Sequence, residues 1–333
     1  MEVGNDRRPP LRVQVVSDGR AGIENQALGL AEAVARLTSA EITIKRVAWR
    51  RAFSRLPTAL QAPWMRDPSS DDPFPAPGDP WPDLWIATGR ASLPFSLAAK
   101  AHAGGRTFVV QTQDPRLSPA RFDLVVAPAH DGLEGDNVFE IVGATHRITP
   151  EALAEGAAPF LDRLNALPRP RVAALIGGRS SAFDLTTDHA ADLAERIAES
   201  VRAHGGSLML TFSRRTPEAA REAMTAWLAQ VPGCIWNGEG ENPLFAFLHA
   251  ADHVLVTEDS ANMATEAAST GKPVHILPMV PRGPAGKFQR LHDELRALGA
   301  TRRFDGALDA WTYPPLNETE RTARAVLEAM AAR

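Results

Sequence analysis

Cysteine is nearly absent from this chain of 333 residues. Its single cysteine, Cys234, cannot form an intrachain disulfide, which fits a reducing compartment or a fold that needs no covalent staple. No second cysteine in a CxxC pattern and no neighbouring histidine accompanies it. We therefore interpret Cys234 as the start of a short buried strand and not as a nucleophile.

Long apolar runs are absent as well. No stretch approaches the roughly 20 apolar residues that a membrane-spanning helix needs. The first ten residues, MEVGNDRRPP, lack the apolar core of a signal peptide. We expect the protein in the cytoplasm, or in contact with the inner face of a membrane only from its surface.

An excess of positive charge is also missing. The formal net charge is −4, with 36 lysines and arginines against 40 acidic residues, which argues against a nucleic-acid partner. The chain has no HExxH motif and no carboxylate pair at ligand spacing, so we expect neither a metal nor another cofactor. Apolar residues make up 44% of the chain and charged residues 23%, the ordinary balance of a globular protein.

Strands and helices alternate along the first half of the sequence. A strand at 13–16, an amphipathic helix at 24–37 and a strand at 42–47 form a β-α-β unit, which predicts a parallel sheet. Further strands are predicted at 84–87, 107–111, 124–127 and 139–142, with a helix at 93–103. Residues 67–83 contain six prolines and five aspartates and predict a surface loop, with disorder as an open alternative.

The alternation starts over in the second half. A helix at 150–167 leads to Pro168-Arg169-Pro170, which we interpret as an interdomain linker. Strands are then predicted at 172–176, 207–211, 234–236, 253–257 and 273–277, and helices at 188–203, 217–230, 243–250, 260–270, 287–298 and 318–332. The pattern predicts an α/β protein with domains at 1–167 and 168–315, a terminal helix at 316–333, and a ligand in the cleft between two parallel sheets.

The first candidate ligand loop runs from Ser17 to Gln26, directly after the first strand. Gly19 and Gly22 let the backbone approach a ligand, and the helix that follows offers N–H groups to an anion. Asp18 is a candidate general base and Arg20 a candidate anion clamp. A helix cap with a tight turn is the simpler alternative, and a GxGxxG fingerprint is absent.

The second candidate is the turn Gly177-Gly178-Arg179-Ser180, which follows the predicted strand 172–176. A glycine pair with an arginine and hydroxyl groups is typical of a phosphate-binding turn. No GKS or GKT follows, so the turn is not a P-loop. An ordinary strand-to-helix turn would use the same residues.

The third candidate spans 211–217. Thr216 is predicted to be a helix N-cap with Pro217 as the first helical residue. Ser213 and Arg214 would then point toward the ligand. A simple capped helix with solvated arginines is equally compatible with these residues.

The fourth candidate, 257–274, is the most informative. A strand ends in polar residues that include Asp259 and Ser260, and a helix of small residues carries Glu266. Ser260 and Glu266 are almost two turns apart and are predicted to share roughly one helix face. Gly271 suits the C-cap that ends the helix. The alternative is a surface glutamate paired with a nearby cation.

Six segments together carry a resemblance to a known family. They are SDGRAGIENQALGL at 17–30, ATGRAS at 87–92, QTQDPR at 111–116, GGRSSAFDL at 177–185, TFSRRTP at 211–217 and TEDSANMATEAASTGKPV at 257–274. The chain resembles the mitochondrial fission Elm-type family of bacteria and plants, a GT-B-like group. The last segment is similar to the nucleotide-sugar region of GT-B glycosyltransferases, where a helix carries a Glu ahead of Gly-x-Pro.

The resemblance implies a GT-B fold, with two Rossmann-like domains facing a central cleft and the last helix crossing back to the first domain. Bacterial members are often labelled nucleoside-diphosphate-sugar epimerases, and plant members are associated with mitochondrial division. We expect a metal-independent glycosyltransferase that uses a nucleoside-diphosphate sugar and a lipid or glycan acceptor. An epimerase on the same fold and a non-catalytic interaction protein stay open.

The residues divide between two expected sides. On the acceptor side we expect Gly19, Arg20, Gly22, Asn25, Gln26 and Arg90, with Asp18 or Asp114 as catalytic base. On the nucleotide side we expect Gly177, Gly178, Arg179, Ser180, Ser213, Arg214, Asp259, Ser260 and Glu266, because a leaving diphosphate needs positive charge and N–H donors. The first loop reads Gly22-Ile23-Glu24 where peptidoglycan glycosyltransferases of this fold have Gly-Gly-His, so a histidine base is not carried over.

One further segment combines aromatic residues with arginines. It contains Trp49, Arg50, Arg51, Phe53, Arg55, Leu60 and Trp64. Basic amphipathic segments bind lipid headgroups through apolar burial and charge attraction, which predicts a weak, salt-sensitive contact with anionic membranes. A core-packed helix with solvated arginines is the alternative.

Overall fold

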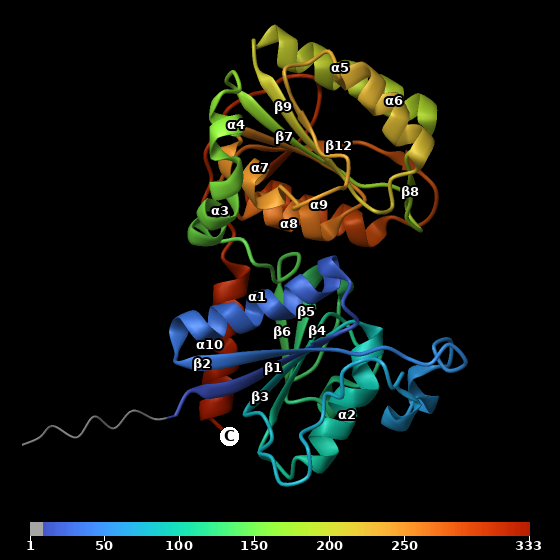
Figure 1. Cartoon of the computed structure of the whole chain (residues 1–333), viewed down its shortest axis with the longest axis vertical. Helices are drawn as coiled ribbons and strands as arrows, with labels where there is room; N and C mark the ends of the chain where they lie inside the picture. The colour runs from blue at the N-terminus through green and yellow to red at the C-terminus, as the bar shows by residue number, and fades with distance from the viewer. Residues whose placement is uncertain (1–8) are drawn as a thin grey trace, which may run out of the picture. The chain divides into compact units, whose positions relative to one another are not determined.

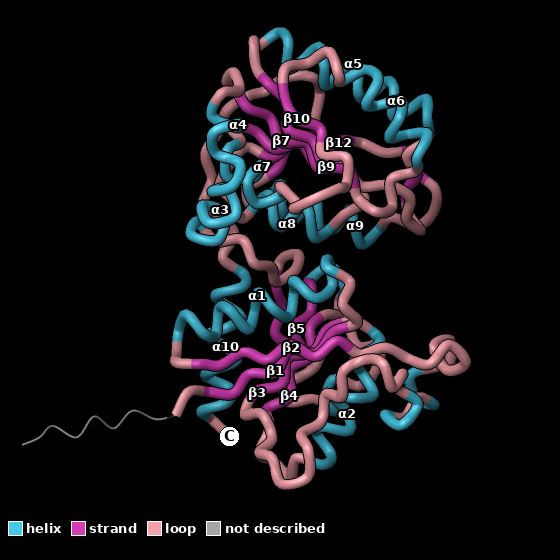
Figure 2. The backbone as a smooth tube through the Cα atoms, in the orientation of Figure 1, coloured by secondary structure: helices cyan, strands magenta, loops and turns pink. Residues whose placement is uncertain are grey.

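The computed structural model describes residues 9–333. They form two compact units (Figures 1 and 2). Unit 1 comprises the described residues up to Arg147 together with Asn317–Arg333, and unit 2 comprises Ile148–Leu316. A six-stranded sheet forms the centre of each unit, and all pairs of neighbouring strands in both sheets are parallel.

Unit 1 has the strand order β2-β1-β3-β4-β5-β6. Its strands are β1 (Leu11–Ser17), β2 (Ala40–Arg46), β3 (Leu84–Thr88), β4 (Phe108–Thr112), β5 (Leu124–Pro128) and β6 (Val138–Ile141). Its helices are α1 (Ala21–Leu37), α2 (Leu93–His102) and α10 (Glu318–Ala331), with short 3-10 helices η1 (Thr58–Leu60), η2 (Pro63–Met65), η3 (Arg90–Ser92), η4 (Pro119–Arg121) and η5 (Ala129–Asp131).

The sheet of unit 1 is buried on both faces. Because successive strand residues point to opposite faces, Ile86 of β3 packs in a cluster with α1 and α10, whereas Trp85 packs in a second cluster with α2. Strands covered on both sides are expected in a parallel sheet and explain their nearly continuous apolar sequences. The carboxyl ends of the strands remain as the edge where polar loops gather.

The last helix belongs to unit 1. The Glu318 carboxylate accepts a hydrogen bond from the Val142 N–H at 2.9 Å, and the Thr319 hydroxyl accepts one from the His146 N–H at 3.0 Å. Ala323 and Val326 are buried in the same cluster as α1. The helix therefore completes a layer of unit 1 although the whole of unit 2 precedes it in the chain.

Unit 2 has the strand order β10-β9-β7-β11-β12-β14. Its strands are β7 (Arg171–Ile176), β9 (Ser207–Phe212), β10 (Gly233–Ile235), β11 (His253–Thr257), β12 (Val274–Leu277) and β14 (Thr301–Arg303), and β8 (Phe183–Asp184) pairs antiparallel with β13 (Val280–Pro281). Its helices are α3 (Pro150–Ala157), η6 (Ala158–Phe160), α4 (Leu161–Asn165), α5 (Thr187–Ala203), α6 (Glu218–Leu228), α7 (Leu244–Ala250), α8 (Ala261–Ala268) and α9 (Gly286–Ala297).

The order of strands reverses between β7 and β11. The chain moves from β7 to β9 on one side of the sheet and later returns to place β11 on the other side of β7. The loops after β7 and β11 therefore run in opposite directions and leave a crevice, which is where ligands bind in open parallel sheets. This switch point positions the candidate site of unit 2.

The structure divides the chain at Arg147 and not at Leu167. The helices α3 and α4 belong to unit 2, where α3 packs against α7 so closely that a Cβ on Gly156 would lie 2.8 Å from Phe245 Cβ. The Pro168–Pro170 segment is internal to unit 2, since the Pro170 carbonyl accepts from the Ser207 N–H at 3.0 Å. The two prolines mark a helix end, and the partner that covers α3 comes much later in the sequence.

The proline-rich segment 67–83 packs against unit 1 and is not a free loop. The Gln14 side chain donates to the Pro73 carbonyl at 2.7 Å, and the Phe74 ring stacks on Trp85 with 6.1 Å between centroids. Disorder was therefore the wrong alternative, because two aromatic side chains of the segment, Phe74 and Trp81, pack against the core of unit 1.

Every strand and helix predicted from the sequence overlaps an element of the structure, whereas β8, β13, β14 and the 3-10 helices were not predicted. Over residues 9–333, no helix has both the length and the apolarity to cross a bilayer. The first eight residues, on which the expected lack of a signal peptide depends, lie outside the described residues.

Candidate functional site

Three loops of unit 2 meet at the switch point, after β7, β9 and β11. The Gly177 N–H donates to the Thr257 hydroxyl at 2.7 Å. The Gly178 N–H donates to the Asp259 carboxylate at 3.1 Å, and Arg215 forms an ion pair with the same carboxylate at 2.6 Å. The fold therefore joins residues that are 81 positions apart in the sequence, Gly178 and Asp259.

Asp259 is the centre of this arrangement. Its side chain is fully buried, and its Oδ2 atom faces both Arg215 and the Gly178 N–H. Its Oδ1 atom has no hydrogen-bond partner among the described residues. Asp259 was predicted as a ligand contact, and the structure shows that part of its carboxylate already holds the site together.

The Gly-Gly turn packs loops together, and its N–H groups are already used. Besides Gly177 and Gly178, the Arg179 N–H donates to the Arg215 carbonyl at 3.1 Å and the Ser180 N–H to the Phe183 carbonyl at 2.9 Å. A Cβ on Gly178 would lie 2.1 Å from the Arg215 carbonyl oxygen. The expected phosphate cradle of backbone N–H groups needs correction, because protein oxygens fill it.

The loop after β9 differs from the prediction by one residue. The helix α6 begins at Glu218 with Pro217 as N-cap, and the buried Thr216 hydroxyl donates to the Ile176 carbonyl at 3.2 Å. Thr216 thus ties two loops together and does not cap the helix. The Ser213 hydroxyl is similarly engaged, since it accepts from the Arg215 N–H at 3.1 Å.

The two consecutive arginines of this loop have different environments. Both are exposed, but Arg215 pairs with Asp259, whereas Arg214 has no hydrogen-bond or ion-pair partner in the described part of the chain. Arg179 lies 3.4 Å from Asp184 and is also exposed. Arg215 was not predicted, because an Arg-Arg pair in a sequence does not indicate which guanidinium reaches the buried aspartate.

Glu266 lies buried in the second turn of α8, with 9% of its surface exposed. Within residues 9–333 no hydrogen-bond or ion-pair partner of its carboxyl is found, and burial alone raises the pKa of Glu266 to about 7. The expected pairing of a surface glutamate with a cation is therefore wrong. An ionisable group that is buried without a partner is costly in a protein and marks this position as a candidate ligand contact.

Ser260 does not share a helix face with Glu266. It precedes α8 as the N-cap, where its hydroxyl accepts from the Met263 N–H at 3.4 Å. Gly271 has the left-handed φ of 72° in the turn that leads to β12, but the helix already ends at Ala268 with Ser269 as C-cap. The predicted end of the helix was therefore two residues too late.

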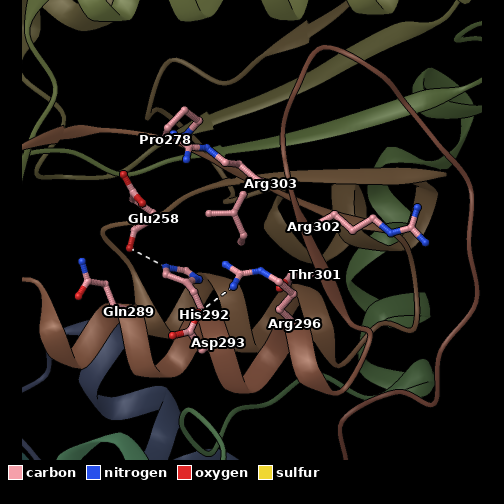
Figure 3. A pocket seen from close by; sticks show the side chains of 10 residues that line it. Glu258, Pro278, Gln289, His292, Asp293, Arg296, Thr301, Arg302 and Arg303 are labelled. Carbon is pink, nitrogen blue, oxygen red and sulfur yellow. Dashed lines mark hydrogen bonds and ion pairs between the residues drawn. The ribbon is translucent and has the colours of Figure 1, made fainter.

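A cavity of about 320 Å³ lies beside the switch point, between α9 and the carboxyl ends of β11, β12 and β14 (Figure 3). His292 donates from Nε2 to the Glu258 carbonyl at 2.9 Å, and burial lowers the pKa of His292. Arg303 has no partner among the described residues, whereas Arg302 points away and lies over the Trp311 ring. These residues were not predicted, since they converge from three separate elements.

The first loop of unit 1 begins with an ion pair. Asp18 and Arg20 form a contact of 2.6 Å across Gly19, whose φ is 75°. The helix α1 already starts at Ala21, so Gly22 is a helical residue and not a loop glycine. Asn25 lies half-buried on the same helix.

Glu24 of this helix was not predicted as a site residue. Its buried carboxylate accepts from the Ser17 hydroxyl at 2.8 Å and from Arg46 at 2.8 Å, and the Arg46 guanidinium lowers the pKa of Glu24. Glu24 thereby joins the carboxyl ends of β1 and β2.

A second cavity, of about 520 Å³, lies at the carboxyl ends of β3 and β4 in unit 1 and is lined in part by Arg90, Gln113 and Asp114. Gln113 and Arg116 have positive φ angles of 67° and 54°. Asp114 pairs with Arg116 at 2.9 Å, and Gln113 donates to the Gln26 side chain at 2.9 Å. The structure therefore collects Gln26, Arg90 and Asp114 in one part of unit 1.

Over residues 9–333, no group of three or more His, Cys, Asp and Glu side chains has the arrangement of a metal site.

The two parallel sheets are those of a GT-B fold, and solved GT-B structures resemble the chain over nearly its whole length. The UDP-GlcNAc 2-epimerase of Methanocaldococcus jannaschii, in complex with UDP-GlcNAc and UDP, matches with a TM-score of 0.53 and 14% identity over 96% of this chain and 100% of that one. MurG of Acinetobacter baumannii matches with a TM-score of 0.50 and 15% identity, again over 96% and 100%. These likenesses show the fold alone.

The family is shown by sequence. The model of the family described as Mitochondrial fission ELM1 matches residues 21–330, and the chain belongs to this family. The Mitochondrial fission protein ELM1 of Arabidopsis thaliana is 33% identical over 283 residues, which cover 76% of this chain and 65% of that protein. The chain thus spans less than two thirds of that relative, and the resemblance to the Elm-type family is confirmed.

Proposed function

We propose that unit 2 binds a nucleoside-diphosphate sugar and that the protein transfers the sugar to an acceptor as a metal-independent GT-B-type glycosyltransferase. The observation that carries this proposal is the buried Glu266 carboxyl of α8, the helix that follows β11, which lacks a partner among the described residues. A carboxylate accepts hydrogen bonds from both vicinal hydroxyls of a ribose at once. The UDP-GlcNAc and UDP complex of the M. jannaschii epimerase supports this class of ligand on the shared fold.

The diphosphate requires cationic donors, because the N–H groups of the turn 177–180 are used within the protein. Arg214 is exposed and has no partner in the described chain, and Arg179 is held only by a contact of 3.4 Å to Asp184. Both guanidiniums offer the geometry that suits phosphate oxygens. We assign the phosphates to Arg179 and Arg214, with the N-terminus of α8 as a further source of positive potential.

In the proposed transfer, the acceptor oxygen bonds to the anomeric carbon while the bond to the diphosphate oxygen breaks. The diphosphate leaves with the electron pair, and the acceptor proton passes to a carboxylate. Asp18 and Asp114 are the candidate bases, each held by an arginine two residues later. The cavity beside Asp114, of about 520 Å³, has room for part of a lipid-linked or glycan acceptor.

Calorimetric titration with UDP and 2′-deoxy-UDP tests the binding site. Glu266→Ala is expected to weaken UDP binding by about tenfold or more, because a hydrogen bond to a charged group contributes about 1.5–3 kcal/mol. Binding of 2′-deoxy-UDP should barely change, because it cannot offer both hydroxyls. Glu199→Ala on the exposed surface of α5 is the matched control. Unchanged binding of both nucleotides by Glu266→Ala would remove the support for this site.

Turnover then separates three functions. Incubation with UDP-GlcNAc and candidate acceptors should yield a transferred sugar under our proposal. A change of configuration at C2 without acceptor would instead indicate an epimerase. Nucleotide binding without either product would favour an interaction protein, the reading that the family's name suggests.

A further inference from the structure

Residues 49–66 form a protrusion of unit 1, which we call the arginine knob. The chain leaves the sheet after β2 and returns to the same place, since Trp49 and Arg66 form an antiparallel bridge and the Asp67 N–H donates to the Ala48 carbonyl at 2.8 Å. Figure 1 shows this part of the chain, in blue, extending to one side of the unit. The knob contains only the short helices η1 and η2, so the long core-packed helix considered from the sequence is wrong.

The knob is joined to unit 1 at its base and at Leu56, whose carbonyl accepts a hydrogen bond from Arg90 at 2.6 Å. The Trp49 ring stacks on Phe95 with 4.9 Å between centroids, inside the core of unit 1. Trp64 and Leu60, by contrast, are 66% and 62% exposed, the highest values among the large apolar residues of the described chain. Within the described residues, Phe53 is the only aromatic ring in contact with Trp64. The two rings meet edge to face, with 5.8 Å between their centroids. Two large apolar side chains therefore face solvent together on a protruding segment.

Positive charge surrounds these side chains. The knob has four arginines and no acidic residue. Arg50 and Arg66 are engaged at the base, where Arg50 donates to the Arg66 carbonyl at 3.2 Å and Arg66 pairs with Asp72 at 3.3 Å. Arg51 and Arg55 are exposed, and their guanidinium groups have no partner in the described residues. The knob thus combines two exposed guanidiniums, which have no partner among the described residues, with the exposed Trp64 and Leu60.

We propose that the arginine knob docks on the surface of an anionic lipid bilayer. Tryptophan and arginine side chains occupy the headgroup region, where the ring finds an apolar neighbour and the guanidinium an anionic one. Leu60 distinguishes a bilayer from a nucleic acid, because an aliphatic side chain cannot stack on bases but is stabilised among acyl chains. The proposal does not depend on nucleotide binding by unit 2, so either can fail alone.

Flotation of the intact protein with phosphatidylcholine vesicles, with and without phosphatidylserine, tests the docking. The wild type should float with the anionic vesicles only, and less so as salt increases. Arg51→Glu combined with Arg55→Glu should lower binding by at least about tenfold, since each arginine near an anionic surface contributes about fivefold. Leu60→Ser combined with Trp64→Ser should lower binding to a similar extent.

Matched controls come from exposed residues elsewhere. Arg121→Glu with Arg163→Glu repeats the charge change, and Trp227→Ser with Leu298→Ser repeats the apolar change. Both control variants should float as the wild type does, and equal melting temperatures for all variants establish that they are folded. The proposal is overturned if the knob variants float as well as the wild type, or if the control variants lose as much binding.

Depth-dependent quenching by brominated lipids gives an independent result. The wild type should be quenched more than Trp64→Phe, which keeps an aromatic ring in the knob and should still float. Equal quenching of the two proteins overturns the insertion of Trp64. The bilayer proposal is also overturned if the protein binds RNA and not vesicles and the arginine variant abolishes RNA binding. The knob would then be a polyanion-binding segment.

Discussion

Glu266 should make the ligand-free protein less stable as the pH rises from about 5 to about 8. Burial raises the pKa of Glu266 from 4.5 to about 7 in the folded state. At a pH between these two pKa values, the folded state keeps a proton that the unfolded state has lost, so the stability of the folded state falls as the pH increases. The difference between the two pKa values corresponds to about 3 kcal/mol of free energy of unfolding. This stability is fully present below the pKa of the unfolded state and is lost as the pH rises through the pKa of the folded state.

Glu266→Gln isolates this contribution. The amide has the shape of the protonated acid but does not ionise, so the stability of the variant should not fall over this range. Above pH 7 the variant should exceed the wild type by up to about 3 kcal/mol. For a unit of this size each kcal/mol changes the melting temperature by about 2–4 °C, so a difference of several degrees is expected.

Differential scanning calorimetry of the intact protein measures the effect. The unfolding transition whose temperature changes when UDP is added is assigned to unit 2. Glu199→Gln, an exposed carboxylate on α5, should follow the wild type at every pH. Parallel curves for the wild type and Glu266→Gln would refute the reasoning, because the carboxyl would then have the pKa of a solvated group. UDP should also bind more tightly above pH 7 than below it, by up to about tenfold per pH unit, because ribose hydroxyls favour the carboxylate.

Three further predictions concern the loops and the last helix. Arg215→Ala should destabilise unit 2 by about 2 kcal/mol in thermal unfolding, because it leaves the buried Asp259 without its cation. Arg214→Ala should leave the melting temperature unchanged and should weaken the binding of UDP more than that of uridine, as measured by calorimetric titration. Gly177→Ala should destabilise by about 1–3 kcal/mol in thermal unfolding, since its Cβ would lie 1.9 Å from Asp259 Oδ1; a stable variant would mean that the loop yields. Deletion of Asn317–Arg333 should unfold unit 1 but not unit 2, seen as loss of one calorimetric transition, because it uncovers the cluster that holds Ala323 and Val326.

Local features could be predicted from the sequence with good agreement. The alternation of apolar strands and amphipathic helices predicted both parallel sheets, because each element is recognised from the spacing of its own residues. The same holds for the position of Glu266, whose helix follows a buried strand and precedes the turn at Gly271. The positions of the candidate loops after β7, β9 and β11 follow for the same reason, since these loops come directly after the predicted strands.

Long-range contacts were beyond such reasoning. The helix α3 belongs to unit 2 because α7 covers it, and no residue near α3 in the sequence carries that information. The segment 67–83 is similar, since its composition predicts a loop while Phe74 places it against Trp85. In both cases the deciding partner lies elsewhere in the chain, so a local pattern gives the wrong boundary or the wrong degree of order.

The site shows the same division at the level of single atoms. The residue types alone predicted that polar groups after β7, β9 and β11 would gather at one edge, because parallel strands end there together. Only the tertiary structure decided that Arg215 and not Arg214 pairs with Asp259. The same is true of the N–H groups after β7, which donate hydrogen bonds to oxygen atoms of the protein itself. Only the tertiary structure, too, decided that Glu266 is buried without a partner among the described residues. The direction and burial of a side chain depend on the backbone of its own loop and on neighbours that other elements supply.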